Sequence, residues 1–319
     1  MARLHVESWA PEYGSPFESD PGLADETKVD EAVETSGPWE PRDGGDDGVD
    51  VVAFVDGVRR IDARLTIDDP AGPVPGICGS FAVGAVLWHR GARRSEVVEP
   101  AVYRLAVFGR GTAAPIPVGE SRLAYRSESV PGDDPGALLQ RLHGAMRKAE
   151  GELSESLARR GLFVVGDGPI NDLSATEKVG YIKTHRAPYL SAARAPIVGR
   201  LRAGQRTPMF LIGCGGPYER YSWYLRLAEV AGGHSWSGVV RTEVSAALPL
   251  DLASAIADRT AAILPLVASA GHIDPRAPQN LVPIAALERD LRRRLGEPAF
   301  VYRELRTAVL RAAAVGAES

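Results

Sequence analysis

The stretch Val51-Val52-Ala53-Phe54-Val55-Asp56-Gly57 decides the fold class. Five consecutive apolar residues are typical of a central, fully buried strand, and Asp-Gly predicts a turn at its end. Directly after it, in 61–67, the odd positions are apolar and the even positions polar, which is the period of a half-buried strand. Two more apolar stretches, 77–88 and 101–108, follow turn-rich connections. The body is therefore predicted to open with a meander of hairpin-linked strands.

The rest of the body mixes strands and helices. A long amphipathic helix is predicted over 135–160, where apolar residues recur at spacings of three, four and seven and Gly161 closes the pattern. A buried strand over 162–165 then ends in Gly166-Asp167-Gly168-Pro169. Further strands are predicted over 179–184, 209–212, 221–227 and 237–244, and further helices over 191–202, 252–267, 284–295 and 300–314. The expected fold class is α/β, a mixed sheet with helices packed on it and additional C-terminal helices.

Composition excludes several classes of protein. The chain has 319 residues, 45% hydrophobic and 24% charged, which is ordinary for a globular protein with a real core. Two cysteines, Cys78 and Cys214, exclude a disulfide framework and a multi-cysteine zinc module. No apolar run approaches the ~20 residues of a membrane span, and the N-terminus shows no secretory signal. We expect a soluble, cytoplasmic protein with no membrane partner.

Charge is divided unevenly along the chain. Residues 1–50 carry 14 acidic and three basic side chains, whereas residues 51–319 carry 27 acidic and 34 basic ones. The part from 18 to 49 is rich in Asp, Glu, Gly and Pro, a composition that predicts a solvated or partner-dependent segment. We therefore expect an acidic, partly flexible N-terminal segment (1–50) and one domain (51–319). The basic excess of that domain suits a polyanion such as DNA, or simply a soluble surface.

Three carboxylates interrupt apolar patterns. Asp56 and Asp167 each end a buried strand, and Glu150 falls within the apolar stripe of the long helix. Taken singly, each has an ordinary explanation, as a turn residue or as one half of a buried ion pair. Together they could hold a divalent cation, because oxygen-only ligands suit Mg²⁺ or Mn²⁺ and two such ions can hydrolyse a phosphodiester. A strand Asp, a helix Glu and a second strand Asp after a meander form the layout of the ribonuclease H-like fold.

At these residues the chain resembles the NurA nuclease family. Phe54-Val55-Asp56-Gly57 is similar to its first acidic motif, and Val164-Val165-Gly166-Asp167-Gly168-Pro169-Ile170 to its second. The family also has a strand with a Gly followed by a Lys, an aromatic strand, and a proline-led entry into a C-terminal helix. Those three motifs resemble Val179-Gly180-Tyr181-Ile182-Lys183-Thr184, Tyr221-Ser222-Trp223-Tyr224-Leu225-Arg226-Leu227 and Asn280-Leu281-Val282-Pro283-Ile284. The order and rough spacing of these motifs fit from about residue 50 to residue 297.

The resemblance implies that 51–319 is a NurA-like nuclease domain with a ribonuclease H-like core. It implies manganese-dependent (or Mg²⁺-dependent) cleavage of DNA by a homodimer that processes DNA ends with a HerA-type hexameric ATPase. Asp56, Glu150 and Asp167 would then be the catalytic metal ligands. The family often has a histidine after the helix-opening proline, and none follows Pro283 here. A fourth ligand is left open among Glu288, which helix phase favours, Asp290 and His272.

Other residues are weaker candidates. Arg59, Lys183 and Arg276 lie in or beside the motif segments and could neutralise phosphate charge, or form surface ion pairs instead. Trp223 or Tyr224 could stack on bases, although consecutive strand residues face opposite ways, so that at most one is available.

The favoured hypothesis is a metal-dependent DNA nuclease, and two others compete with it. One is a catalytically weak adaptor that docks a DNA translocase. The other is a small-molecule phosphotransferase, which would require a Ser or Thr soon after the first Asp-Gly, where Val58-Arg59-Arg60 stands instead. No G-x-x-x-x-G-K-[ST] phosphate loop is present, so nucleotide hydrolysis is not expected.

Overall fold

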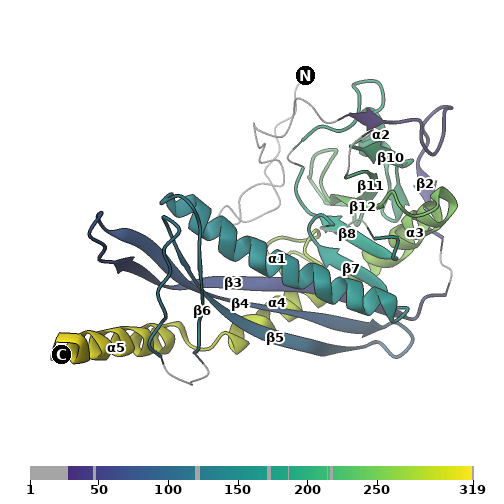
Figure 1. The fold of residues 1–319 in the computed structure, drawn as a ribbon. Coiled ribbons are helices and arrows are strands. Elements are labelled where there is room, and N and C mark those ends of the chain that lie inside the picture. Colours follow the sequence, from purple (N-terminus) through teal and green to yellow (C-terminus); the bar gives the residue numbers. More distant parts are fainter. Residues whose placement is uncertain are drawn as a thin grey trace. The chain divides into compact units, whose positions relative to one another are not determined.

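The computed structural model describes residues 28–45, 48–118, 123–170, 174–185, 187–213, 215 and 218–317 (side chains to 312), so that Cys214 lies outside the described residues. The chain divides into two compact units. Unit 1 comprises Met1–Val55, Val86–Glu96 and Leu153–Ala286, and unit 2 comprises Asp56–Ala85, Val97–Glu152 and Leu287–Ser319. Five elements, labelled in Figure 1, contribute residues to both units: β3 (Val51–Ile67), β4 (Val74–His89), β5 (Arg94–Phe108), α1 (Pro135–Arg159) and α4 (Val282–Arg294).

Unit 1 contains a mixed sheet. Its strand order is β1-β10-β11-β12-β8-β7-β3, and β9 pairs with both β11 and β2. The pairs β3–β7 and β7–β8 are parallel, whereas the pairs from β8 outward to β1 are antiparallel. This arrangement confirms the predicted mixed sheet. The remaining strands are β1 (Val29–Asp30), β2 (Arg42–Asp43), β7 (Phe163–Asp167), β8 (Lys178–Ile182), β9 (Gln205–Arg206), β10 (Phe210–Ile212), β11 (Arg220–Arg226) and β12 (Val239–Ser245).

Helix α3 (Leu250–Ile263) covers one face of the unit 1 sheet, followed by a short 3₁₀ helix (Leu264–Val267). Its apolar side chains share one core with strand residues such as Phe54, Val165 and Trp223. The opposite face forms a second core around Phe210 and Tyr224, which α2 (Pro196–Arg200) helps to close. The helix predicted over 191–202 is thus shorter than expected, because a proline at its first position starts the helix only at residue 196.

Unit 2 contains the strands in the order β3-β4-β5-β6, with β6 (Arg126–Ser129) parallel to β5. Successive side chains of a strand point to opposite faces of the sheet, and in unit 2 a different helix covers each face. Odd positions of β4 and β5, such as Phe81 and Leu105, pack with Leu142 of α1. Even positions, such as Cys78 and Phe108, pack with Leu305 of α5 (Pro298–Ala317). The predicted helices packed on a sheet, and the additional C-terminal helices, are confirmed; a ribonuclease H-like topology stays a prediction.

The turn predicted at Asp56-Gly57 is wrong. Strand β3 is continuous over 17 residues, and Asp56 and Gly57 lie inside it. Glycine is needed there for a different reason, because a Cβ at position 57 would collide with Oε1 of Glu150 on α1. An isolated glycine inside a strand often marks such a close approach rather than a turn.

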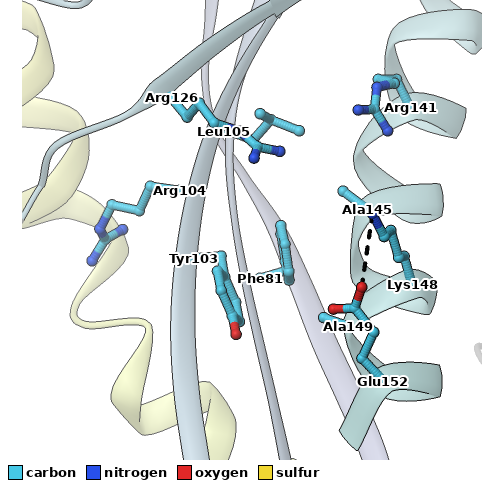
Figure 2. A pocket seen from close by; sticks show the side chains of 10 residues that line it. All are labelled: Phe81, Tyr103, Arg104, Leu105, Arg126, Arg141, Ala145, Lys148, Ala149 and Glu152. Carbon is cyan, nitrogen blue, oxygen red and sulfur yellow. Dashed lines mark ion pairs between the residues drawn. The ribbon is translucent and has the colours of Figure 1, made fainter.

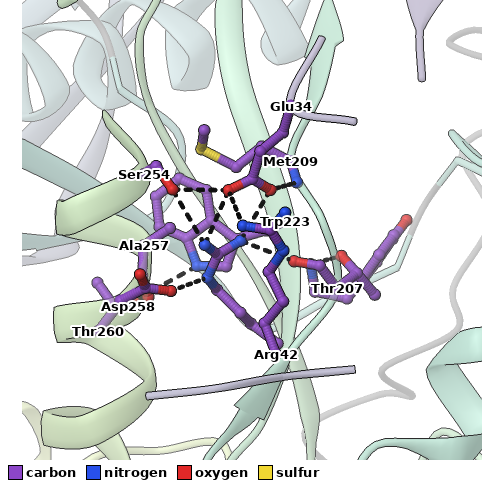
Figure 3. Close-up of polar contacts among 11 residues, drawn as sticks. Glu34, Arg42, Thr207, Met209, Trp223, Ser254, Ala257, Asp258 and Thr260 are labelled. Atoms are coloured by element: carbon purple, nitrogen blue, oxygen red, sulfur yellow. Dashed lines mark hydrogen bonds and ion pairs between the residues drawn. The ribbon is translucent and has the colours of Figure 1, made fainter. Parts of the chain in front are cut away.

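The described part of the acidic segment is not simply solvated. Strand β1 pairs with β10, β2 pairs with β9, and the side chain of Trp39 is buried. Between the two strands, the carboxylate of Glu34 (labelled in Figure 3) accepts hydrogen bonds from Nη1 and Nη2 of the fully buried Arg206, at 3.0 and 2.9 Å. One buried ion pair therefore fixes residues that composition alone assigns to solvent.

In the described parts of the chain, no helix is both long and apolar enough to cross a membrane.

Candidate metal centre

Asp56 and Asp167 occupy corresponding positions on two parallel strands. The register of β3 against β7 pairs Val55 with Gly166, and Asp56 and Asp167 are the next residues along each strand. Parallel strands in register carry matching residues side by side, so the two carboxylates project from the same level of the sheet. The backbone N–H of Gly57 donates a 2.8 Å hydrogen bond to Oδ1 of Asp56 and fixes the orientation of that carboxylate.

A third carboxylate joins this pair. One oxygen each from Asp56, Asp167 and Glu288 lie within 4.8 Å of one another. Asp56 and Glu288 are only 6% and 8% exposed. Carboxylates this close repel one another unless a cation or a proton compensates, and their oxygens are the donors that hard divalent cations take. The residues therefore fit a Mn²⁺ or Mg²⁺ ion by the chemistry of the donor set.

Glu150 is not a member of this group of three. It is buried on α1, and its carboxylate lies against the backbone of Gly57, one residue beyond Asp56. The helix phase that placed Glu150 on the inward face is therefore right, and the missing side chain of Gly57 provides its space. The structure thus places Glu150 beside the strand that carries Asp56, without bringing it into the set of three.

Lys183 is held between two acceptors at the end of β8. Its Nζ donates to Oδ2 of Asp167 at 2.7 Å and to Oδ1 of Asn280 at 2.8 Å. The other end of the Asn280 carboxamide donates to Oδ2 of the buried Asp274 at 2.7 Å. Burial acts to raise the pKa of Asp274, but hydrogen bonds from Asn280 and Arg276 outweigh it and the pKa is lowered. The result is a continuous chain, Asp274–Asn280–Lys183–Asp167, with an ammonium group fixed beside the second carboxylate.

The turn after Asp167 is held from behind by a buried ion pair. Glu243 on β12 is fully buried and accepts a 3.1 Å hydrogen bond from the backbone N–H of Ile170. Arg241, 6% exposed, lies 2.5 Å from the Glu243 carboxylate and compensates its charge. Gly168 turns the chain with a φ of +97°, a conformation that glycine adopts without strain. These contacts fix the turn that directly follows Asp167 at the end of β7.

The remaining residues predicted from the sequence are not members of the group of three carboxylates. Arg59 is exposed. Burial is the main cause that lowers the pKa of His143, and the nearby charge of Arg59 lowers it further. Arg276 forms an ion pair with Asp274 at 3.5 Å. Asp290 pairs with Arg293 and Arg294 at 3.1 and 2.5 Å on the outer side of α4, and His272 is exposed.

The expectation that Trp223 or Tyr224 could meet DNA bases is wrong. Both side chains are buried: Trp223 donates from Nε1 to Thr260 on α3, and Tyr224 stacks on Phe210. The sequence alone suggested that one face of β11 is exposed. Strand β11 is instead covered on both faces, so that consecutive side chains such as Trp223 and Tyr224 are both buried.

Sequence reasoning also missed the supporting residues Asp274, Asn280 and Glu243. Asn280 stands in the segment that leads into α4 and could have been noticed as a polar residue directly before an apolar run. Glu243, an acid beside Val244 in the predicted strand 237–244, gave a similar signal. Neither signal names a partner, because the partners lie 97 and 73 positions away in the chain.

Comparisons with known proteins add little. No protein-family model matches the chain, and no curated protein matches it. Among solved structures, the crystal structure of the NurA nuclease from Sulfolobus solfataricus aligns with a TM-score of 0.45 and 9% sequence identity, covering 79% of this chain and 81% of that one. A similarity of this degree does not by itself establish a shared activity.

Proposed function

We propose that this chain is a metal-dependent nuclease that hydrolyses phosphodiester bonds of DNA. The observation that carries the proposal is the group of three carboxylates, Asp56, Asp167 and Glu288, with their oxygens within 4.8 Å of one another. Two of them follow hydrophobic strand motifs that resemble those of NurA nucleases. Mn²⁺ or Mg²⁺ is the proposed cofactor, since the donors are oxygens only.

The residues divide the chemistry between them. Asp56, Asp167 and Glu288 would hold the cation, and Glu150, beside Gly57, is the proposed fourth acidic residue of the site. A divalent cation bound there supplies Lewis-acid stabilisation of the phosphoryl charge and a bound water of lowered pKa. Lys183 orients Asp167 through its 2.7 Å hydrogen bond and adds a positive charge where a phosphate oxygen would approach.

The substrate and partners follow from charge and from the sequence resemblance. The excess of basic residues over 51–319 favours a polyanion, because bound phosphates release counterions. Arg59 and Arg276 remain proposed phosphate contacts, together with Lys183. By resemblance to the NurA family, we propose that the chain acts as a cytoplasmic homodimer that processes DNA ends with a HerA-type hexameric ATPase.

A cleavage assay on end-labelled linear DNA tests this proposal. The protein is expected to cut the DNA with Mn²⁺, and excess EDTA is expected to stop cleavage. Asp56→Asn, Asp167→Asn and Glu288→Gln should each lose cleavage while keeping the fold. Asp290→Asn is the matched control for Glu288→Gln, because it lies two residues along the same helix with its carboxylate on Arg293 and Arg294. Titration calorimetry with Mn²⁺ alone should show weakened binding in the first three variants only.

A catalytically weak adaptor that docks a DNA translocase is the second candidate. One observation favours it: α5 exposes apolar side chains that a partner could cover, namely Phe300, Tyr302, Val309 and Leu310. The two roles separate in the same assay. Cleavage that persists undiminished in excess EDTA, or that Asp56→Asn leaves unchanged, would reject the metal-dependent nuclease; absence of any cleavage with intact translocase binding would favour the adaptor.

A further inference from the structure

Unit 2 contains a pocket of about 270 Å³ between α1 and strands β4 and β5 (Figure 2). Its floor is aromatic: the ring of Tyr103 stacks on the buried ring of Phe81, with 4.9 Å between centroids and 17° between planes. Tyr103 is 44% exposed, which is unusual for a large ring in a strand covered by a helix. The pocket therefore offers a flat apolar surface that is already oriented by a packed neighbour.

Small residues on the helix create the space. Ala145 and Ala149 line the pocket from α1, while larger residues of the same helix fill the core beside them. Residues 141, 145, 148, 149 and 152 lie on one face of the helix, as the spacing of three and four requires. The volume is near the lower end of small-ligand sites (~300 Å³), which fits one planar group with its substituent rather than a longer segment.

The rim of the pocket is basic. Arg126, Arg141 and Lys148 line it, and Glu152 is the acid among its lining residues, 3.7 Å from Lys148. Both arginines contact the same carboxylate, Glu128, which holds the two guanidinium groups near each other. Arg126 enters the pocket because β6 is in register with β5 at Leu105. Arg104 also lines the pocket, but its guanidinium donates to the carbonyl of Leu295 and so does not belong to the basic rim.

We infer that this pocket binds one nucleotide of single-stranded DNA, with the base stacked on Tyr103 and the neighbouring phosphates against Arg126 and Arg141. An exposed aromatic platform beside guanidinium groups is the combination that holds unpaired strands, since every base has a face to stack and every nucleotide a phosphate. The choice of DNA as the polymer rests on the proposed nuclease function. Binding at this pocket is a separate property from cleavage.

Fluorescence anisotropy of a labelled oligothymidylate, measured with the full chain in EDTA, tests the inference. Tyr103→Ala is expected to weaken binding roughly 5- to 150-fold, the effect of losing one base–aromatic stack. Tyr103→Phe keeps the ring and should bind like the unaltered chain. Val102→Ala is the matched control, because Val102 is similarly exposed (39%) on the same strand but faces the other side of the sheet. Arg141→Gln should reduce the dependence of affinity on salt.

Three results would overturn the inference. Tyr103→Ala could bind as tightly as the unaltered chain; an abasic strand with the same phosphates could bind as tightly as oligothymidylate; or free thymidine monophosphate could displace the strand at equal nucleotide concentration, which would make the occupant a mononucleotide. Failure here is distinguishable from failure of the nuclease proposal. Loss of Mn²⁺-dependent cleavage with Tyr103-dependent binding intact rejects the nuclease alone, and cleavage without Tyr103-dependent binding rejects the pocket alone.

Discussion

Glu34 and Arg206 form a buried ion pair, with 2.9 Å between Oε1 of Glu34 and Nη2 of Arg206, and one substitution removes the glutamate charge. Oε1 of Glu34 accepts hydrogen bonds from Arg42, Arg206 and Ser254, and Oε2 from Arg206 and the backbone N–H of Met209 (Figure 3). The Glu34 side chain is only 6% exposed. Glu34→Gln removes the negative charge with little change of shape and replaces one acceptor oxygen by an NH2 group, so it tests what the ionised carboxylate contributes to this contact.

The magnitude follows from the pKa of Glu34. Burial alone would raise this pKa, but the hydrogen bonds and charge of Arg206, helped by Ser254 and Met209, lower it from 4.5 to about 2. That difference corresponds to roughly 3 kcal/mol of stability. Because the pKa of the folded state lies below that of the unfolded state, the contribution is complete above about pH 4.5 and is lost as the pH falls toward 2.

Urea unfolding followed by tryptophan fluorescence measures this contribution. At pH 7, Glu34→Gln is expected to lower the free energy of unfolding by about 2–4 kcal/mol, since Arg206 keeps Asp258 as a second partner at 2.7 Å. The difference from the unaltered chain should shrink to about half or less at pH 3. Glu40→Gln is the control: its carboxylate is exposed and pairs with Arg200 at 3.7 Å, so a change under about 0.5 kcal/mol is expected.

A free energy of unfolding for Glu34→Gln within about 0.5 kcal/mol of the unaltered chain at pH 7 would show that the Glu34 charge does not stabilise the fold. A loss as large at pH 3 as at pH 7 would show the same, because a loss that does not depend on protonation does not come from the carboxylate charge.

Two further predictions concern the candidate metal centre. Gly57→Ala should lower the free energy of unfolding by about 1–3 kcal/mol and abolish Mn²⁺-dependent cleavage, because the new Cβ displaces the carboxylate of Glu150. Gly144→Ala is the control, since Gly144 lies on the same helix as Glu150 and a Cβ there meets nothing within 4 Å. It should leave cleavage unchanged and raise the melting temperature slightly. Asn280→Leu removes the carboxamide that donates to the buried Asp274. In urea unfolding, the free energy of unfolding should fall by about 1–3 kcal/mol, and the cleavage rate should fall as well. Unaltered stability would show that this hydrogen bond contributes nothing to the fold.

Much of the local structure could be predicted from the sequence, because it depends on near neighbours in the chain. Helix α1 ends at Arg159, as its apolar spacing indicates, and Gly161 follows with a φ of +80°. The strands around Asp56 and Asp167 were likewise visible as apolar runs. Their carboxylates could be selected as candidates because an acid at the end of a buried run is costly unless something compensates it.

The sequence-based predictions were wrong where a residue far away in the chain contacts the segment and outweighs its local preference. Asp56-Gly57 has the composition of a turn, yet Glu150 packs over Gly57 and the strand continues. The acidic stretch around Glu34 has the composition of a solvated segment, yet Arg206, 172 positions away, draws it into a buried ion pair. In both cases a partner that local pattern does not name outweighs the local preference.

The sequence by itself determined the alternation of strands and helices, the uneven charge and the acids worth testing, because periodicity, turn chemistry and desolvation cost act within a few residues. Only the tertiary structure decided that Asp56 and Asp167 meet Glu288, that Lys183 is held by Asn280, and that Tyr103 stays exposed above Phe81. The physical reason is that these contacts depend on strand register and helix placement. Both are fixed by the sum of many packing interactions across the chain rather than by any one motif.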